Sequence, residues 1–422
     1  MSDITDFYQQ QAVAGASDIP WLAQMQHRAL ADFERLGFPT RKDEEWKYTL
    51  VDGFVKRQFV NAAGNVKHAA APTDIPVSCS KIAIVNGVIK GAEALAATLP
   101  AGVVVLPIAQ AILSHAKLIK PWLGQIMKQE HGFQALNTAM LQCGLFIYLP
   151  AGTCLPEPLL LSHWQDQTQQ ATYIRHLVIA EAGSCATIIE DYQGESSSEY
   201  LTNTVTEVHA AANAAITHYK IQRESKLAFH IGHLAVRQAA NSQFDSHLFS
   251  FGGKLVRSDA TFSMEESHAR CFMNGIYAPA DGQHMDFHTL VNHAVPDCNS
   301  AQDYKGILTG RSRAVFNGKV IVAKDAQHTE AKQQNKNLLL SLDAEIDTKP
   351  QLEIFANDVV CTHGATVGQL DEEALFYLAT RGIDYTEASH YLIQAFAAEN
   401  VRAITDVNLA TWLGTLLNEQ IG

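Results

Sequence analysis

Membrane-spanning runs, basic stretches and secretion signals are missing from this 422-residue chain, and each absence excludes a class of protein. No uninterrupted apolar run approaches the roughly 20 residues that a membrane-spanning helix needs. The 31 Lys and Arg residues stand against 44 Asp and Glu, and the net charge of −13 argues against binding to nucleic acid or to anionic membranes. The first residues show no basic segment followed by an apolar one, so we expect no signal peptide.

Cysteine and the common catalytic motifs are scarce as well. The seven cysteines are scattered and odd in number, which is typical of reduced thiols and predicts a cytoplasmic protein without a disulfide framework. The glycines near residues 252 and 306 are not followed by the Gly-Lys-Ser/Thr ending of a phosphate-binding loop, so no ATP site is visible. The Gly-x-Ser-x-Gly motif of serine hydrolases is also absent.

The first part of the chain has a helical pattern. Apolar residues recur at three- and four-residue steps from Trp21, and Gly37 follows as a stop signal, which predicts a helix over 21–36. We predict an N-terminal helical and mixed domain over residues 1–145. Its other expected elements are two short strands at 82–87 and 103–106 and a second helical region at about 106–142, which a proline interrupts.

From about residue 145 to 360 the chain is rich in β-branched and aromatic residues, and no helical period persists. Clusters of small or polar residues lead into strand patterns at 29-, 28- and 26-residue intervals, and a fifth cluster follows 45 residues later, which could contain two shorter turns. These clusters begin at Ala182, Ala211, Ala239, Glu265 and Gly310. A drifting period of this length is typical of a β-solenoid, in which each coil stacks on the last. An antiparallel sandwich of hairpins is the alternative.

The last part of the chain returns to helical patterns, and we predict a C-terminal helical domain over residues 366–422. Asp371 is an N-cap candidate before an acidic first turn, and Gly382 is the expected stop of that helix. Thr386 is the expected cap of a second helix that runs to Glu399. A third helix carries an apolar stripe, formed by Leu409, Trp412, Leu413, Leu416 and Leu417.

A thiol and an imidazole lie two residues apart near the end of the β-rich region. Cys361 and His363 follow an alternating strand pattern, so we expect them to face the same side of a strand. Gly364 would allow another backbone to approach closely. A cysteine and a histidine form a metal-competent pair with too few ligands to close a site, which predicts a half-site. The alternatives are a hydrogen-bonded histidine at a sheet end and a cysteine that only fills the core.

A second cluster of potential ligands comprises His284, Asp286, His288, His293 and Cys298. In a strand the first three residues would share one face, and the last two are expected beyond a turn. A metal site here is therefore a minor alternative.

Arg41, Lys42, Trp46 and Lys47 form a basic and aromatic cluster that could bind an anion or a flavin. We expect a structural role instead, in which Trp46 anchors the N-terminal segment to the β-rich body.

Three blocks of sequence carry a resemblance to a known family. They are GFPTRKDEEWKYT at 37–49, YKGILTGRSRAVFNGK at 304–319 with its continuation to residue 341, and the segment 347–382, which contains CTHGAT. In this order they resemble the SufB/SufD family, whose members are scaffold subunits for iron–sulfur cluster assembly. The resemblance implies a mainly β protein, with a right-handed parallel β-helix core over 146–365 and helical segments at both ends. It also implies no catalysis by this chain alone.

The resemblance further implies partners and a site. In this family a D subunit pairs with a B subunit, and each binds the ABC-type ATPase SufC through its C-terminal helices. A nascent cluster or iron is expected at the SufB interface, with His363 as a candidate ligand and Cys361 beside it, and the chain alone is expected to hold neither. Leu378 stands where B subunits carry a cysteine, and B subunits lack the CTHGAT run, so the chain resembles the D branch. Whether a flavin binds is left open.

The ATPase contact is expected within residues 371–400. The candidate contact residues are Leu375, Tyr377, Leu378, Tyr391, Leu392 and Phe396. An open coil end also offers strand edges for pairing, with SufB or with a second copy of the chain. The rival from another class is a β-helix enzyme acting on polysaccharide, but the candidate acids Asp303, Asp325 and Glu330 show no paired carboxylates at a telling spacing.

Overall fold

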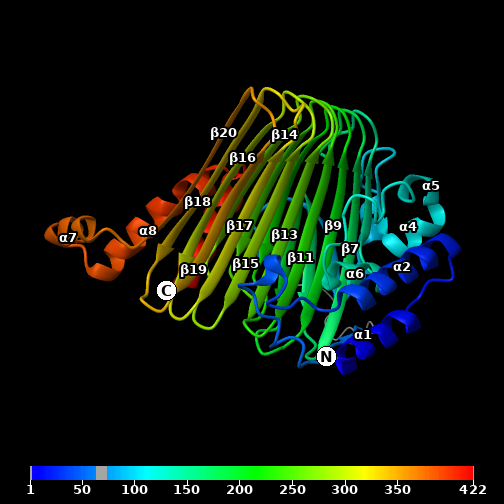
Figure 1. The fold of residues 1–422 in the computed structure, drawn as a ribbon, viewed down its shortest axis with the longest axis horizontal. Helices are drawn as coiled ribbons and strands as arrows, with labels where there is room; N and C mark the ends of the chain where they lie inside the picture. The colour runs from blue at the N-terminus through cyan, green and yellow to red at the C-terminus, as the bar shows by residue number, and fades with distance from the viewer. Residues whose placement is uncertain (1, 63–73, 422) are drawn as a thin grey trace.

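The computed structural model of the protein describes residues 2–62 and 74–421, and its centre is a parallel β-solenoid (Figure 1). Sheet A contains β1 (Val60–Asn61), β4 (Val104–Pro107), β5 (Leu145–Leu149), β7 (Gln170–Ala180), β9 (Leu201–Ala210), β11 (Phe229–Gln238), β13 (Leu255–Met264), β15 (His284–His293), β17 (Arg313–Val322) and β19 (Glu345–Ile354). Sheet B contains β2 (Ser80–Val85), β3 (Val88–Lys90), β6 (Leu159–Gln165), β8 (Cys185–Gly194), β10 (Ala215–Gln222), β12 (Gln243–Ser250), β14 (Arg270–Tyr277), β16 (Asn299–Leu308), β18 (Thr329–Leu339) and β20 (Val359–Gly368). The predicted parallel β-helix is confirmed, and the sandwich alternative is wrong.

Successive strands alternate between the two sheets, and the main core fills the space between them. On β10, Ile216 belongs to this core, whereas Tyr219 and Ile221 face outward against the C-terminal helices. Parallel strands that are covered on both faces become almost continuously buried. This double coverage explains why the strand sequences show little alternation between apolar and polar residues.

The tight turns from sheet A to sheet B explain the recurring small and polar clusters. Each turn has a residue with positive φ, a conformation that glycine and asparagine adopt at low cost. These residues are Gly183, Asn213, Asn241 and His268, and the next turn on this edge has Asp297. The cluster at Gly310 lies on the opposite edge, between β16 and β17, so the 45-residue interval is one and a half coils and not two short turns.

Helices cover the outer face of sheet A at the start of the solenoid (Figure 1). They are α1 (Ser2–Ala14), α2 (Pro20–Leu36), η1 (Glu44–Trp46), α4 (Ile108–Ser114), α5 (Ala116–Ile119) and α6 (Gly132–Ala139), and α3 (Ala92–Ala96) lies near β4. The prediction for α2 is confirmed, whereas the second helical region is three short helices. Trp46 is 2% exposed, stacks on Phe133 and lies beneath Arg257, so its predicted anchoring role is confirmed.

The C-terminal helices are α7 (Glu372–Thr380), α8 (Tyr385–Arg402) and α9 (Val407–Ile421). Leu409, Leu413 and Leu417 are buried in a cluster with outward side chains of sheet B. Asp371 caps α7 as predicted. The cap of α8 is Asp384, whose carboxylate accepts from the Glu387 N–H, so the prediction of Thr386 as cap is wrong. No helix in the described part of the chain is long and apolar enough to cross a membrane.

The expectation that every cysteine is reduced is wrong for one pair, because the structure joins Cys154 and Cys185 in a disulfide. The two residues are register partners on neighbouring coils. Their separation of 31 residues is about one coil, and the sequence alone does not show which residues one coil brings side by side. The other five cysteines are free thiols.

Candidate functional site

The solenoid ends in an uncovered coil formed by β19 and β20. β19 is the last strand of sheet A and β20 is the last strand of sheet B, and within residues 2–62 and 74–421 no strand pairs with their outer edges (Figure 1). Leu352 and Val359 pack on the core at this coil but are only half-buried. Phe355 and Val367 of the same coil are 62% and 50% exposed. Unpaired strand edges beside apolar side chains are suited to pairing with another chain.

Both residues of the predicted half-site lie on β20. Cys361 is opposite Ala331 of β18, and His363 is opposite the buried Gln333. Cys361 is half-buried and packs against the core between the sheets, and burial raises the pKa of its thiol. His363 is two residues further along, so it projects to the same side, and it is exposed.

No third ligand from the chain joins this pair. Among the described residues there is no group of three or more His, Cys, Asp or Glu side chains that could hold a metal ion. A Cβ added at Gly364 would meet nothing within 4 Å, so the chain itself makes no close approach there. The arrangement leaves the exposed imidazole of His363 accessible from outside.

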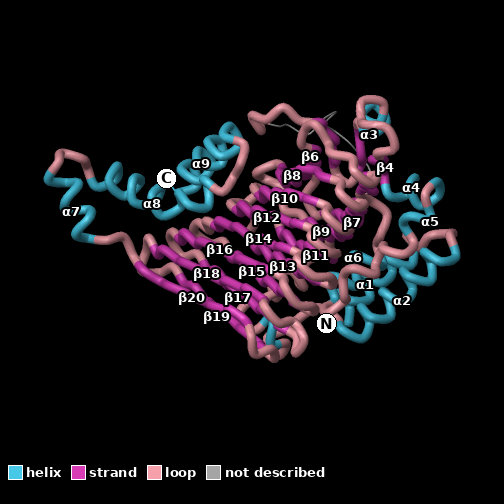
Figure 2. The backbone as a smooth tube through the Cα atoms, turned by 90° about the horizontal axis from the view of Figure 1, so that it is seen from above, coloured by secondary structure: helices cyan, strands magenta, loops and turns pink. Residues whose placement is uncertain are grey.

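The candidate contact residues on the C-terminal helices fall into two groups. α7 projects from the solenoid near β20 (Figures 1 and 2) and has no buried residue, although its side chains are largely apolar. Tyr377 and Tyr391 are exposed, whereas Leu375, Leu378 and Leu392 are half-buried. Phe396 instead packs toward sheet B, where the Lys305 ammonium lies over its ring.

Sequence reasoning missed the most exposed aromatic side chain of α7. Phe376 is 72% exposed. It lies beside Tyr377, which the sequence singled out, but only the structure shows that no residue of this helix is buried. An apolar helix without a buried face is the signal that points to a partner.

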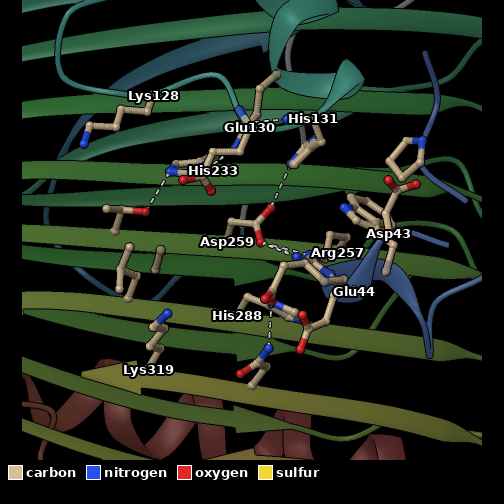
Figure 3. Close-up of a pocket in the computed structure, with 18 of the residues that line it drawn as sticks. Asp43, Glu44, Lys128, Glu130, His131, His233, Arg257, Asp259, His288 and Lys319 are labelled. Atoms are coloured by element: carbon tan, nitrogen blue, oxygen red, sulfur yellow. Dashed lines mark hydrogen bonds and ion pairs between the residues drawn. The ribbon is translucent and has the colours of Figure 1, made fainter. Parts of the chain in front are cut away.

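A polar cavity of about 660 Å³ lies between the N-terminal segment, the start of α6 and the outer face of sheet A (Figure 3). Arg257 is at its wall and donates to Asp259 at 2.9 Å, to Asp286 at 2.7 Å and to the Glu45 carbonyl at 2.8 Å. His288 lies between the carboxylates of Glu45 and Asp286, at 3.1 and 3.0 Å. These contacts connect the N-terminal segment around Glu45 to the outer face of sheet A.

The charges of this network shift one another's proton affinities. Burial and the nearby Arg257 act to lower the pKa of His288, but Asp286 and Glu45 outweigh them and raise it above its ordinary value. Burial would raise the pKa of Asp286, but Arg257 and His288 hold it well below its usual range. The hydrogen bond from His288 lowers the pKa of Glu45. The network is therefore a set of mutually compensating charges.

The second predicted cluster of ligands is divided between the two faces of β15. His284, Asp286 and His288 share the outer face as predicted, where Thr49 bonds to both His284 and Asp286. Asp286 also accepts from Arg257 there and pairs with His288. His293 is the last residue of the same strand and is not beyond a turn, and its side chain turns into the core. It bonds there to Ser300 at 2.9 Å, and Cys298 is also buried in the core. The minor metal-site alternative thus lacks a shared centre.

The basic residues of the N-terminal cluster line a neighbouring cavity of about 460 Å³. Arg41, Lys42 and Lys47 are there, but Glu44 and Asp347 line the same cavity. The mixture of signs does not single out an anionic ligand, and flavin binding stays a prediction without a test.

Two family descriptions match almost the whole chain. "SUF system FeS cluster assembly, SufBD core domain" matches residues 163–396, and "SufBD protein N-terminal region" matches residues 2–161. The chain belongs to the SufBD family. The core match includes the uncovered coil, α7 and much of α8, so the surfaces described above are part of the SufBD architecture and not additions to it.

Individual SufBD relatives agree. The chain is 34% identical over 385 residues to the iron–sulfur cluster assembly protein SufD of Escherichia coli (strain K12), covering 89% of this chain and 87% of that protein. It is 31% identical over 421 residues to the iron–sulfur cluster assembly SufBD family protein slr0076 of Synechocystis sp., covering 96% and 92%. It is 33% identical over 264 residues to the chloroplastic protein ABCI7 of Arabidopsis thaliana, covering 60% and 56%. As a SufBD protein, the chain is an iron–sulfur cluster assembly protein.

Proposed function

We propose that this SufBD protein is a non-enzymatic, SufD-type scaffold subunit that assembles an iron–sulfur cluster together with a SufB-type partner. The observation that carries the proposal is the place of His363, which is exposed on the last strand of an uncovered coil. A neutral imidazole can ligate iron or exchange a proton with a thiolate. A partner that adds strands beyond β19 and β20 would bring its own ligands next to this imidazole.

Cys361 has a supporting role in this proposal. Its raised pKa keeps the thiol protonated near neutral pH, and a metal ion must displace that proton before the sulfur can bind. Cys361 also packs against the core, so its sulfur is less accessible than the His363 imidazole. We therefore assign the exposed histidine as the first contact for iron and the thiol as its neighbour.

The C-terminal helices are the proposed site for the SufC-type ATPase. The aromatic residues Phe376 and Tyr377 of α7 are 72% and 57% exposed, although the Arg381 guanidinium lies over one face of the Tyr377 ring. Aromatic side chains of this kind are frequent anchors in protein interfaces. Phe396 supports the position of α8, because it packs toward sheet B.

Hydrogen bonds connect α8 to sheet B at β14 and β16, three and two coils before the uncovered coil. The side chain of Asn400 donates to Asn274 on β14 and to the Asp303 carbonyl on β16. Lys305 on β16 donates to the Phe396 carbonyl at 2.8 Å and pairs with Glu399. We propose that nucleotide-driven motion of the ATPase pulls on α7 and α8 and shifts the partner interface toward an open state that admits iron and sulfur.

The test is anaerobic cluster formation on the co-expressed complex of this chain with its SufB- and SufC-type partners. We compare wild type, His363→Ala and the control His268→Ala, which removes an exposed histidine from a turn three coils away. The cluster's visible absorption and the bound iron are measured, and complex assembly is checked by size-exclusion chromatography. Loss of the cluster only in His363→Ala, with the complex intact, supports the proposal. A normal cluster in that variant refutes a role for His363.

The cytoplasmic location stays a prediction. The relative from Arabidopsis thaliana is a chloroplastic protein, so proteins similar to this chain are not confined to one compartment.

A further inference from the structure

Two cysteines face each other on neighbouring coils at the end of the solenoid that lies opposite β20. Cys154 is in the connection from β5 to β6, and Cys185 is the first residue of β8. They are partners in a parallel bridge, with Cα atoms 4.3 Å apart and their sulfurs joined. The iron–sulfur function proposed above does not use this pair.

One cysteine of this pair, Cys154, is exposed, which makes it more accessible than any other cysteine of the chain. Cys185 is half-buried, as are the free Cys79, Cys143 and Cys361, whereas Cys271 and Cys298 are buried. Ala186, the next residue after Cys185, packs in the core, so Cys185 itself lies on the outer face of sheet B. Small oxidants and thiol reductants in solution can therefore reach the sulfurs without unfolding of the core.

The backbone holds the two cysteines together independently of the sulfur–sulfur bond. The Leu155 N–H donates to the Cys185 carbonyl at 2.9 Å, and the Cys185 N–H donates to the Thr153 carbonyl at 3.0 Å. The Gly152 N–H also donates to the adjacent turn at 2.8 Å. After reduction these ladder bonds keep the thiols side by side, so closure of the disulfide is intramolecular and is favoured by a high effective concentration.

We propose that Cys154 and Cys185 form a reversible thiol–disulfide site that hydroperoxides oxidise and dithiols reduce. In the oxidation, one thiolate attacks the peroxide oxygen, which gives a sulfenic acid and releases the alcohol, or water in the case of hydrogen peroxide. The second thiol then attacks the sulfenic sulfur and releases water. The two sulfurs together lose two electrons, and the O–O bond of the hydroperoxide accepts them.

The reverse step needs only a dithiol. A thiolate of the reductant attacks one sulfur of the disulfide and forms a mixed disulfide, which the reductant's second thiol resolves. Both cysteines are then released as thiols, and the reductant leaves as its cyclic disulfide. Closing the bond ties the first coil, which carries β5 and β6, to the coil that carries β8.

The experiment counts thiols in the full-length protein. The folded chain is reduced with dithiothreitol, freed of reductant, treated with hydrogen peroxide, and then unfolded and alkylated for mass spectrometry. We expect all seven cysteines to be alkylated after reduction and five after peroxide, with Cys154 and Cys185 recovered as one linked peptide pair. A second round of dithiothreitol on the folded protein should restore seven, with unchanged circular dichroism.

Two variants and one probe separate the proposal from general oxidation. Cys154→Ser should no longer form a linked pair, whereas Cys79→Ser should keep the two-thiol change. Phenylarsine oxide, which bridges two adjacent thiols, should bind one equivalent per reduced wild-type chain and none per Cys154→Ser chain. Retention of all seven thiols after peroxide, linkage of other cysteines, or reduction that requires unfolding would each overturn the proposal.

Discussion

Removal of exposed apolar side chains from the last coil should weaken binding of the SufB-type partner and leave this chain stable. Phe355 lies in the turn between β19 and β20, and Val367 lies near the end of β20. Their exposed fractions of 62% and 50% represent apolar surface that no residue in the described part of the chain covers. Truncation to alanine removes this exposed surface, and neither side chain belongs to the buried core, so the free chain should lose little stability.

The size of the effect follows from the exposed fractions. Complete burial of a Phe or Val side chain is worth about 1.5–3 kcal/mol. With 62% left to bury, Phe355→Ala should cost about 1–2 kcal/mol of binding free energy, and Val367→Ala, at 50%, should cost about 0.8–1.5 kcal/mol. At about 1.4 kcal/mol per tenfold, these values correspond to roughly 5- to 30-fold and 4- to 12-fold weaker binding. The two effects need not add, since both residues belong to one coil.

The assay is isothermal titration of the purified partner into each variant, with thermal unfolding of the free chain as a check on stability. The matched control is Leu113→Ala, because Leu113 is 74% exposed but lies on α4, far from the last coil. It should bind like wild type. If Phe355→Ala and Leu113→Ala bind the partner equally tightly, the assignment of the uncovered coil as the interface is refuted. Sedimentation of the chain alone reveals whether a second copy occupies the same surface.

Three further results are expected. Phe376→Ala should reduce capture of the SufC-type ATPase in a pull-down without changing the thermal midpoint, because Phe376 is 72% exposed; unchanged capture would remove α7 from the proposed contact. Arg257→Ala should destabilise the chain by about 3–5 kcal/mol in urea unfolding, because it leaves buried carboxylates without their partner; a loss below about 1 kcal/mol would contradict this account. The raised pKa of His288 contributes stability that is complete below its unfolded pKa and is lost as pH rises through its higher folded pKa, so His288→Gln should flatten the pH dependence of stability between the ordinary histidine pKa and the raised one. Glu45 has the opposite pH dependence, because its pKa is lowered in the folded protein. Its contribution to stability is lost as pH falls through its folded pKa.

The sequence predicted the repeating coils because their turns need particular residues. Positive φ at Gly183 and Asn213 requires small or polar residues at one point in each coil, and that requirement appears directly in the sequence. The same requirement applies at Gly310 on the opposite edge, so the turn chemistry could not reveal which edge a turn belongs to. At α8, Asp384 and Thr386 are both good N-caps, and only the structure shows the carboxylate of Asp384 accepting the N–H of the helix.

The candidate site was only partly predictable, because its parts depend on neighbours in space. The pattern placed Cys361 and His363 on one strand and one face, but their exposure depends on β20 being the last strand of its sheet. His293 was expected beyond a turn, whereas β15 continues through ten residues and ends at His293. The Cys154–Cys185 pair lies 31 residues apart, and the repeat of 26 to 29 residues seen in the sequence does not show which residues of neighbouring coils are register partners.

The two ends of the solenoid differ in a way that supports the partner. At the first end, β3 and β4 pair antiparallel with β2 and β5 and close both sheets within the chain. At the other end, β19 and β20 have no such strand among the described residues, and most apolar residues of this coil are only half-buried or exposed. A solenoid normally covers its final coil with a polar cap, because an open coil exposes both core and strand edges. The missing cap is therefore best supplied by a second chain, and His363 lies on the strand that this chain would cover.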